Sequence, residues 1–227
     1  ELGPRPHKWG IRKFMWSWDA DIWWQQEGRL ESRELSATPL GILWDTGEFL
    51  MTGYSSQYEY LQEPFEISDG VVIQPGAYLF DRGDLRFETA NFRKWRFEVG
   101  SSFGTFYDGR METYEGEFAL KPNASFQTAF SMEYVTGRVS GGSFIQRLMG
   151  LQLNYNFSPD VTLSTFTQYD NESEELGTNI RFRWTVTPGT DLFLVYNRGW
   201  THIPDEVLRL PPAYDQFVVK FVYTWRP

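Results

Sequence analysis

Apolar and polar residues alternate along the last segment of the chain, at 216–226. One face of this segment carries apolar and aromatic residues, namely Phe217, Val219, Phe221, Tyr223 and Trp225. The positions between them carry Gln216, Lys220, Thr224 and Arg226, together with Val218 and Val222. A period of two predicts a β-strand, and about 9–11 tilted residues are enough to cross a lipid bilayer. The pattern is typical of the closing strand of an outer-membrane β-barrel, with its apolar face toward lipid.

The same alternation recurs along the chain and predicts an all-β protein. We expect about twelve strands, which we place at 8–18, 32–44, 47–61, 77–90, 92–106, 109–120, 123–138, 143–157, 160–171, 177–187, 190–200 and 215–226. An even number of antiparallel strands suits a transmembrane barrel of up-and-down topology. We expect the last strand to close the barrel against the first, and residues 1–227 to form one domain.

The connections between these strands fall into two classes. One class consists of tight turns rich in Pro, Gly, Asn and Asp, at 45–47, 89–91, 121–123, 158–160 and 187–189. The other consists of longer connections, at 19–31, 62–75, 107–110, 139–142, 171–176 and 200–214. The two classes alternate along the chain, as short periplasmic turns and longer external loops do in outer-membrane barrels. This alternation predicts a location in the bacterial outer membrane with both termini in the periplasm.

Aromatic residues of the apolar face fall near the two ends of the predicted strands. Near the periplasmic ends lie Trp44, Trp95, Phe118, Phe126, Tyr155, Trp184 and Trp225. Near the external ends lie Trp16, Trp18, Tyr58, Tyr134, Tyr169, Tyr196 and Phe217. Amphipathic rings prefer the two membrane–water interfaces. We therefore expect two aromatic belts that contact outer-membrane lipid and lipopolysaccharide.

The opposite face of the predicted strands is charged. Its charged residues are Lys94, Arg96, Glu98, Glu115, Glu117, Arg181, Arg183 and Lys220. Buried charges are costly unless they are paired or hydrated, so we interpret this face as the lining of a polar lumen. Two interpretations of the lining remain open. The charges form either a selectivity ring around a channel or cross-strand pairs that fill a narrow barrel.

Composition agrees with a barrel and excludes other classes of protein. Aromatic residues make up 18% of the 227 residues, and the mean hydropathy is −0.45. No apolar run is long enough for a transmembrane helix. The absence of cysteine excludes disulfides and thiolate metal sites, and the net charge of −9 argues against a nucleic-acid partner. Because no signal peptide begins at Glu1, we expect a processed chain or a part of a longer one.

Few residues offer catalytic or metal-binding chemistry. Of the two histidines, His7 precedes the first predicted strand, and His202 lies in an external connection near Asp205 and Glu206. No Gly-x-Ser-x-Gly motif accompanies His202, so we expect no catalytic residue and keep His202 as the single candidate. The acidic segment 170–175 lacks the spacing of a calcium loop and is interpreted as a solvated charge run. We expect no metal and no cofactor.

Five segments resemble motifs of a known family. They are 70–78 (GVVIQPGAY), 109–110 (GR), 167–171 (TQYDN), 176–184 (LGTNIRFRW) and 188–197 (PGTDLFLVYN). The chain resembles the C-terminal barrel of a group of uncharacterised bacterial outer-membrane proteins. Their N-terminal domain is similar to a family-nine carbohydrate-binding module. The resemblance implies a barrel and carbohydrate as a class of solute, although that domain is not part of this sequence and the sequence ends in Trp-Arg-Pro rather than in an aromatic residue.

These features predict a non-enzymatic outer-membrane barrel. It serves as a pore for small polar solutes, carbohydrates among them, or as the membrane anchor of a binding module. Two alternatives remain. One is a structural subunit that docks partner proteins of an envelope complex, and the other is a surface lipase or protease that uses His202. A fold alone does not choose between such functions.

Overall fold

The structure is a computed structural model that describes residues 1–6, 8–26, 28–201 and 211–224. The described residues form strands and connections, without a helix. The strands are β1 (Ile11–Trp24), β2 (Leu30–Trp44), β3 (Phe49–Leu61), β4 (Phe65–Ser68), β5 (Val71–Ile73), β6 (Gly76–Glu88), β7 (Trp95–Phe106), β8 (Gly109–Leu120), β9 (Phe126–Val139), β10 (Gly142–Ser158), β11 (Val161–Asp170), β12 (Glu175–Thr187), β13 (Thr190–Thr201) and β14 (Pro212–Tyr223). The predicted all-β class is confirmed.

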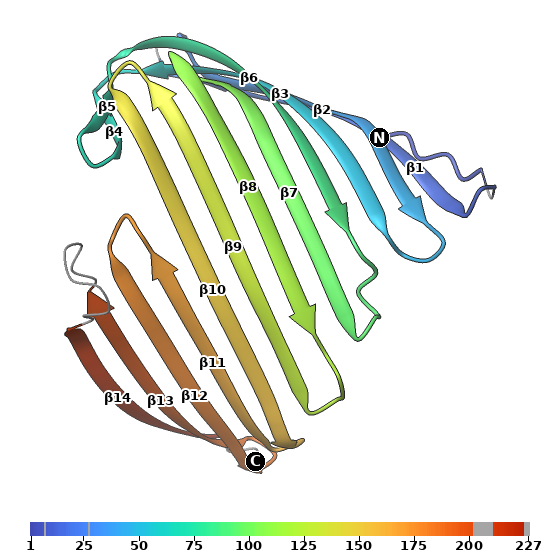
Figure 1. The fold of residues 1–227 in the computed structure, drawn as a ribbon, viewed down its shortest axis with the longest axis vertical. Helices are drawn as coiled ribbons and strands as arrows, with labels where there is room; N and C mark the ends of the chain where they lie inside the picture. Colours follow the sequence, from blue (N-terminus) through green and yellow to red (C-terminus); the bar gives the residue numbers. More distant parts are fainter. Residues whose placement is uncertain (7, 27, 202–210, 225–227) are drawn as a thin grey trace. The chain divides into compact units, whose positions relative to one another are not determined.

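Twelve of the strands form one antiparallel sheet (Figure 1). Within this set of twelve, each strand pairs with the one before it and the one after it in the chain. The order is β1-β2-β3-β6-β7-β8-β9-β10-β11-β12-β13-β14, and β4 and β5 form a separate two-stranded sheet. The twelve strands correspond to the twelve predicted from the alternation. The expected closure differs, because the order ends at β1 and at β14 and the sheet is not closed.

The edge of β1 is partly occupied by the first residues of the chain. The amide N of Leu2 donates to Trp16 O at 2.8 Å, and Trp16 N donates to Leu2 O at 2.9 Å. Phe14 N donates to Pro4 O at 3.0 Å. The predicted partner of β1, the strand at 215–226, is therefore not its neighbour within the described residues. The N-terminal segment takes up the hydrogen bonds of the first half of β1 instead.

Several strand boundaries differ from the predicted ones by a few residues, and the largest difference is at the end of β1. β1 continues to Trp24, whereas residues 19–24 were expected in a long connection. Asp19 lies opposite Ser36 and Asp21 opposite Glu34, while Ile22 lies opposite Arg33. The charges at 19 and 21 suggested a loop, but they belong to the polar side of an alternating strand. At the other end of the chain, β14 begins at Pro212 rather than at 215.

The predicted alternation of tight turns and longer connections holds only in part. β7 and β8 are joined by residues 107–108 alone, and β9 and β10 by residues 140–141 alone. At the opposite strand ends, residues 89–94 join β6 to β7 and residues 121–125 join β8 to β9. Connections expected to be longer are thus as short as a two-residue hairpin turn. Among the connections that the structure describes in full, the one between β3 and β6, at 62–75, carries a hairpin of its own.

The chain divides into two compact units. The first contains Glu1–Phe92, Arg96–Gly116 and Glu133–Gln146, and the second contains Arg93–Trp95, Glu117–Met132 and Arg147–Pro227. The register within each unit fixes which residues share a face, because directly opposite residues of paired strands lie on the same side of a sheet.

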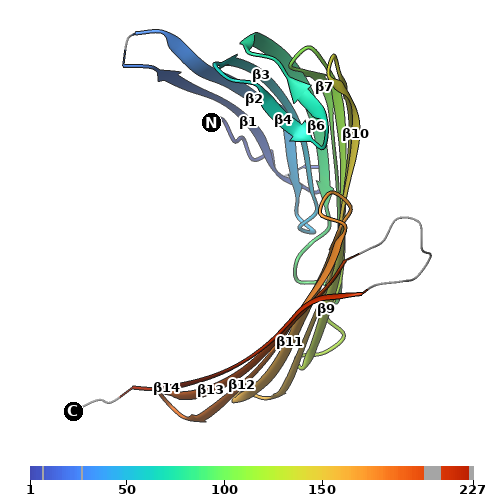
Figure 2. The ribbon, with the colours of Figure 1, turned by 90° about the vertical axis from the view of Figure 1, so that its left-hand side faces the viewer.

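The buried core of the first unit lies under the β4–β5 hairpin. It consists of Val71, Ile73, Val135, Val139 and Phe144, and Ile73 is fully buried. The hairpin contributes its own apolar residues, and β9 and β10 contribute the others. Gln146 Nε2 also donates a hydrogen bond to Ile67 O at 3.3 Å. The hairpin, which lies beside β6 in Figure 2, is thereby packed against the sheet instead of extending as a free loop.

Candidate functional site

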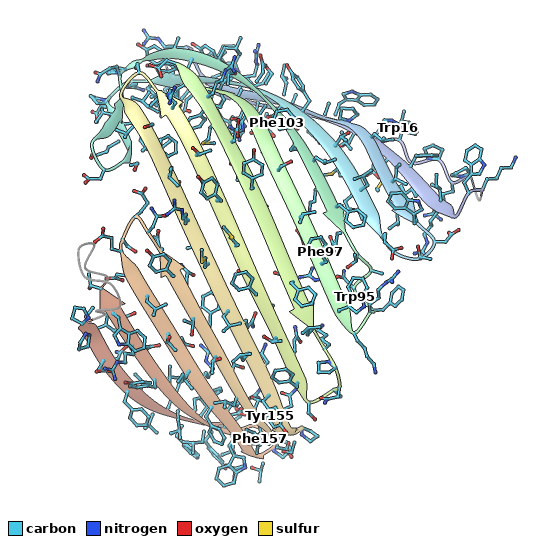
Figure 3. The ribbon with its side chains drawn as sticks, in the orientation of Figure 1. Trp16, Trp95, Phe97, Phe103, Tyr155 and Phe157 are labelled. Carbon is cyan, nitrogen blue, oxygen red and sulfur yellow. The ribbon has the colours of Figure 1, made fainter. Side chains whose placement is uncertain are left out.

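In the first unit, one face of the sheet is apolar and uncovered. Along β7, the alternate residues Phe97, Val99 and Phe103 are exposed, and Phe103 has 58% of its surface accessible. Figure 3 shows Phe97 and Phe103 spaced along this strand. The intervening residues Arg96, Glu98 and Ser102 lie on the other side. We call the side of Phe97 the apolar face and the side of Glu98 the polar face of this unit.

The second unit is two-faced in the same way. On β12, Phe182 and Trp184 alternate with Arg181 and Arg183, so the apolar and polar faces of this unit are defined by these two pairs. The apolar face continues on β14, where Phe217 and Phe221 are both 63% exposed. The described residues contain no layer that covers this face. Large apolar side chains are therefore exposed while charged side chains face the other side.

An ion-pair network lies on the polar face of the first unit. Glu88 of β6 and Glu98 of β7 are directly opposite each other. Arg96 Nη1 lies 3.7 Å from Glu88 Oε1 and 3.5 Å from Glu98 Oε2. Arg86 Nη2 forms a further ion pair with Glu98 Oε1. The four side chains neutralise one another, which offsets the repulsion between two opposed carboxylates.

Arg82 and Asp84 extend the polar face toward the other end of β6. Arg82 Nη2 donates to Ser102 Oγ at 2.8 Å, and Arg82 Nη1 donates to Met111 O at 3.3 Å. The carboxylate of Asp84 lies over Gly53, where a Cβ would overlap Asp84 Oδ1. The missing side chain at 53 leaves the space that this carboxylate occupies. These charges are therefore built into the cross-strand packing.

The polar face of the second unit changes character along its strands. Near the ends of β12 and β13 joined by their tight turn, Arg183 Nη2 lies 2.9 Å from Asp191 Oδ1, which also accepts from Thr185 Oγ1 at 2.6 Å. The Arg183 guanidinium lies 5.8 Å from the centroid of Phe193. Farther along the strands, the polar side chains are amides instead of ions. Asn179 Nδ2 donates to Asn197 Oδ1 at 2.5 Å, and Asn197 Nδ2 donates to Gln216 Oε1 at 3.2 Å.

A tyrosine at the turn between β7 and β8 links that turn to β3. Tyr107 Oη donates to Glu59 Oε2 at 2.8 Å. Its ring packs edge-on against Tyr78 at a centroid distance of 5.1 Å. Burial raises the pKa of the Tyr107 phenol, and the hydrogen bond to the Glu59 carboxylate raises it further. The phenol is therefore neutral at physiological pH and stays a donor to Glu59.

The structure places most of the predicted lumen charges on the polar faces. Glu115 lies close to Gly100, where a Cβ would be 3.4 Å from Glu115 Oε2, and Glu117 is the next residue of the same side of β8. Arg181 and Lys220 lie on the polar face of the second unit and are exposed. Lys94 differs, because it lies in the connection before β7 and not within a strand. Its backbone O accepts from Lys121 N at 2.6 Å.

The predicted interface aromatics are exposed or half-buried wherever the structure describes them. Trp18, Trp95, Tyr155 and Trp184 are exposed, and Tyr155 packs against Phe157 at a centroid distance of 4.7 Å (Figure 3). Trp16 is half-buried and stacks on Phe14, with ring centroids 5.6 Å apart. Trp44 and Tyr196 are also half-buried, and Tyr196 Oη donates to Asp215 Oδ1 at 2.5 Å. Trp225 and the candidate catalytic His202 lie outside the described residues.

Several polar residues were not singled out from the sequence. They are Arg82, Asp84, Arg86, Asn179 and Asn197, whereas Gln216 was already assigned to the polar side of the last strand. Their alternation with apolar neighbours was a signal for the polar face, but their partners depend on the register of neighbouring strands. Sequence patterns on one strand do not contain that register.

No group of three or more metal-ligating side chains occurs in the described ranges. The part of the chain that the structure describes also contains no helix long and apolar enough to cross a membrane. The chain matches no family model, no curated protein and no solved structure.

Proposed function

We propose that this chain is a transmembrane β-barrel of a bacterial outer membrane that passes small polar solutes along its polar face. One observation carries the proposal. The large apolar side chains of both units are exposed on one face, while ion pairs and amides occupy the other. Exposed apolar surface costs about 25 cal/mol per Å² in water. Lipid removes that cost, and a polar face turned away from lipid keeps its charges hydrated.

The two free strand edges favour closure of the sheet in a membrane. Backbone groups without partners are costly in hydrocarbon, which is why transmembrane sheets are closed. Among the residues that the structure describes, β14 pairs with β13 alone, and the second half of β1 pairs with β2 alone. We propose that these edges are satisfied on insertion, either by each other or by further strands. The N-terminal segment on β1 would then be displaced.

The strand ends suit the headgroup region. On the apolar face of the second unit, Asp215 lies near the start of β14 and is 3.8 Å from Arg198 Nε, with Tyr196 as a further partner. The apolar face is thus polar at this end, where lipopolysaccharide and other lipid headgroups would lie. In the proposed orientation, these strand ends lie outside the cell and both termini lie in the periplasm. The resemblance to outer-membrane proteins with carbohydrate-binding-like domains adds carbohydrate as a solute class and remains a prediction.

Reconstitution into planar bilayers tests the proposed pore. We expect stepwise conductance, and we expect Arg183→Glu to shift the reversal potential in a salt gradient toward cation selectivity. Arg198→Glu is the matched control, because Arg198 lies on the apolar face and should leave selectivity unchanged. A sealed bilayer with a correctly folded protein would contradict a pore. Equal shifts for both variants would contradict the assignment of the polar face to the lumen.

One alternative has a specific observation in its favour. The free edge of β14 offers unpaired backbone groups to a strand of another protein, which is how sheets take up partner segments. The chain would then be a structural subunit of an envelope complex or the anchor of a binding module. Copurification of a partner at fixed stoichiometry in mild detergent, together with a sealed bilayer, would favour this function over the pore. Loss of a measured lipase or protease activity in His202→Ala would instead favour the surface enzyme.

A further inference from the structure

A hollow of about 280 Å³ lies on the polar face of β11–β14, entirely within the second unit. Its volume is near the lower end of the range of small-molecule sites. Phe166, Gln168, Asn179, Asn197 and Tyr214 are among the residues that line it. They come from four neighbouring strands, and no separate loop is needed to bring them together.

The register explains how these residues meet. Phe166 lies opposite Asn179, Asn179 opposite Asn197, and Asn197 opposite Gln216. The three amides are joined by the two hydrogen bonds described above, which fix their orientation. Asn179 Oδ1 and Gln216 Nε2 keep no hydrogen-bond partner among the described residues. The row therefore presents a free acceptor at one end and a free donor group at the other.

Two aromatic rings lie beside the amide row on the polar face. Tyr214 lies opposite Gly199, and a Cβ on Gly199 would overlap Tyr214 Cε1. A Cβ on Gly150 would lie 3.5 Å from Phe166 Cε2. Each ring thus packs over a glycine of a neighbouring strand, which holds it against the sheet and leaves its other side open. Phe166 is 44% exposed and Tyr214 is 47% exposed.

The rings of Phe166 and Tyr214 lie on the polar face, whereas most aromatic residues of the second unit lie on the apolar face. In the described part of the second unit, the polar face carries one other aromatic residue, Phe193. Phe193 already has the Arg183 guanidinium as a partner. Phe166 and Tyr214 have no ring or cation partner in the described residues. Open aromatic surface on an otherwise polar face indicates a ligand with apolar as well as polar groups.

The lining contains no cation. Its carboxylates are Asp170 and Glu175 at the edge of the hollow. Asp170 is occupied by its own turn, because Oδ1 accepts from Glu172 N at 2.9 Å and Oδ2 accepts from Ser173 Oγ at 3.2 Å. Between the rings the lining is uncharged. An anionic ligand would meet acidic groups without a cation, and a cationic ligand could use the acceptor Asn179 Oδ1 but would leave the donor Gln216 Nε2 without a partner.

We infer that the hollow binds a neutral carbohydrate. The C–H face of a sugar ring packs against Phe166 or Tyr214, while its hydroxyls, which both donate and accept, bind the amides of Asn179 and Gln216. The inference rests on the proposed function in one respect, namely that the polar face is in contact with water and not with lipid. It adds to that function a binding site for one class of solute.

Calorimetric titration of the folded protein tests this site without relying on conductance. The detergent must lack a sugar headgroup, and the probes are maltose, cellobiose, digalacturonate and choline. We expect at least one of the two neutral disaccharides to bind, and neither the anion nor the cation to bind as tightly. Absence of binding by both disaccharides would overturn the inference. Tighter binding of choline or digalacturonate would overturn it as well.

Single-residue variants show whether the disaccharide binds in this hollow. We expect Tyr214→Ala to weaken disaccharide binding by about tenfold, and Tyr214→Phe to change it by less than about twofold. Tyr223→Ala is the control, because Tyr223 is on the same strand but on the apolar face. Asn197→Ala removes the central amide and should also weaken binding, whereas Asn154→Ala, outside the lining, should not. Equal affinities across these variants would overturn the site.

The binding and conductance experiments test the carbohydrate site and the pore independently of each other. Binding with the expected variant pattern in a protein that does not conduct would remove the pore and keep the carbohydrate site. Conductance without disaccharide binding would do the reverse. If both are present, Tyr214→Ala should abolish any blockade of the current by maltose or cellobiose without changing the conductance in salt alone.

Discussion

Glu88 and Glu98 are directly opposite each other on β6 and β7, and they share Arg96 as an ion-pair partner. Two carboxylates in this arrangement repel each other unless a cation lies between them. Arg96 is a neighbour of Glu98 on the same face of β7, so its guanidinium reaches both groups. The ion pair between Arg86 and Glu98 adds a second positive charge. The charge balance of this part of the polar face therefore depends on two arginines.

We expect Arg96→Gln to destabilise the pairing of β6 with β7. The variant leaves Glu88 with no ion pair in the described residues and leaves Glu98 paired with Arg86 alone. The side chains are only partly buried, so the expected loss is about 1 kcal/mol in the free energy of unfolding. A urea titration in lipid vesicles measures it. Arg181→Gln is the matched control, since Arg181 is exposed and has no ion pair in the described residues. An equal effect of the two variants would show that the pairing of Arg96 contributes nothing.

Removal of the Tyr107 hydroxyl should show a defined pH dependence. Tyr107→Phe loses the hydrogen bond to Glu59, and we expect a cost of about 1 kcal/mol after allowance for partial exposure. The phenol pKa is raised in the folded state. Its stabilisation is therefore complete below the unfolded pKa of about 10 and is lost as the pH rises through the folded pKa.

The stability difference between wild type and Tyr107→Phe should accordingly be constant from about pH 6 to about pH 9 and shrink above about pH 10. Unfolding titrations at several pH values measure it, with Tyr155→Phe as the control for an exposed tyrosine. A difference that grows with alkaline pH would be opposite in sign and would contradict the assigned hydrogen bond.

The β4–β5 hairpin should detach when its contact with the β9–β10 turn is blocked. A Cβ on Gly141 would overlap the backbone O of Val72. Backbone atoms cannot rotate away as a side chain can, so Gly141→Ala should push the hairpin from the sheet. We expect cleavage by a glutamyl endopeptidase at Glu66 to become about tenfold faster, as a ~1.4 kcal/mol loss of local stability would produce. Gly116→Ala is the control, because its Cβ would have 3.9 Å of space. Unchanged cleavage would mean that the hairpin tolerates displacement.

The sequence predicts the strands well because they follow from a single pattern, the alternation of apolar and polar residues with a period of two. Alternating apolar residues mark all twelve strands of the sheet, since each strand has one polar and one apolar face. The β4–β5 hairpin was missed because β5 is a run of three apolar residues, Val71–Ile73, without alternation. Its apolar residues are buried against β9 and β10, more than sixty residues later in the chain. Such a contact depends on tertiary packing and leaves no local period.

The candidate sites are harder to predict from the sequence than the strands are. The predicted lumen charges were selected strand by strand, and Arg96, Glu98 and Arg183 do have ion-pair partners. Their partners Arg86 and Asp191 were not predicted, because a shift of one residue in register would reverse the face of either one. The amide row of Asn179, Asn197 and Gln216 requires the registers of three strands at once. Turn lengths were less informative than expected, since hairpin turns of two residues occur at both ends of the strands.

Two neighbouring residues of β14 distinguish a lipid-facing surface from a water-facing one. Phe221 is opposite Leu192 on the apolar face, and Val222 is opposite Asp191 on the polar face. If lipid covers the apolar face, Phe221→Arg should cost about 2–4 kcal/mol, as arginine does near the bilayer midplane. Val222→Arg places the same charge beside a carboxylate and should be tolerated. In water an arginine at the exposed position 221 would cost little, so a large difference between the variants requires lipid contact. The folded fraction in vesicles, measured by heat-modifiable gel mobility and urea titration, decides this, and equal stabilities would contradict the membrane-spanning assignment.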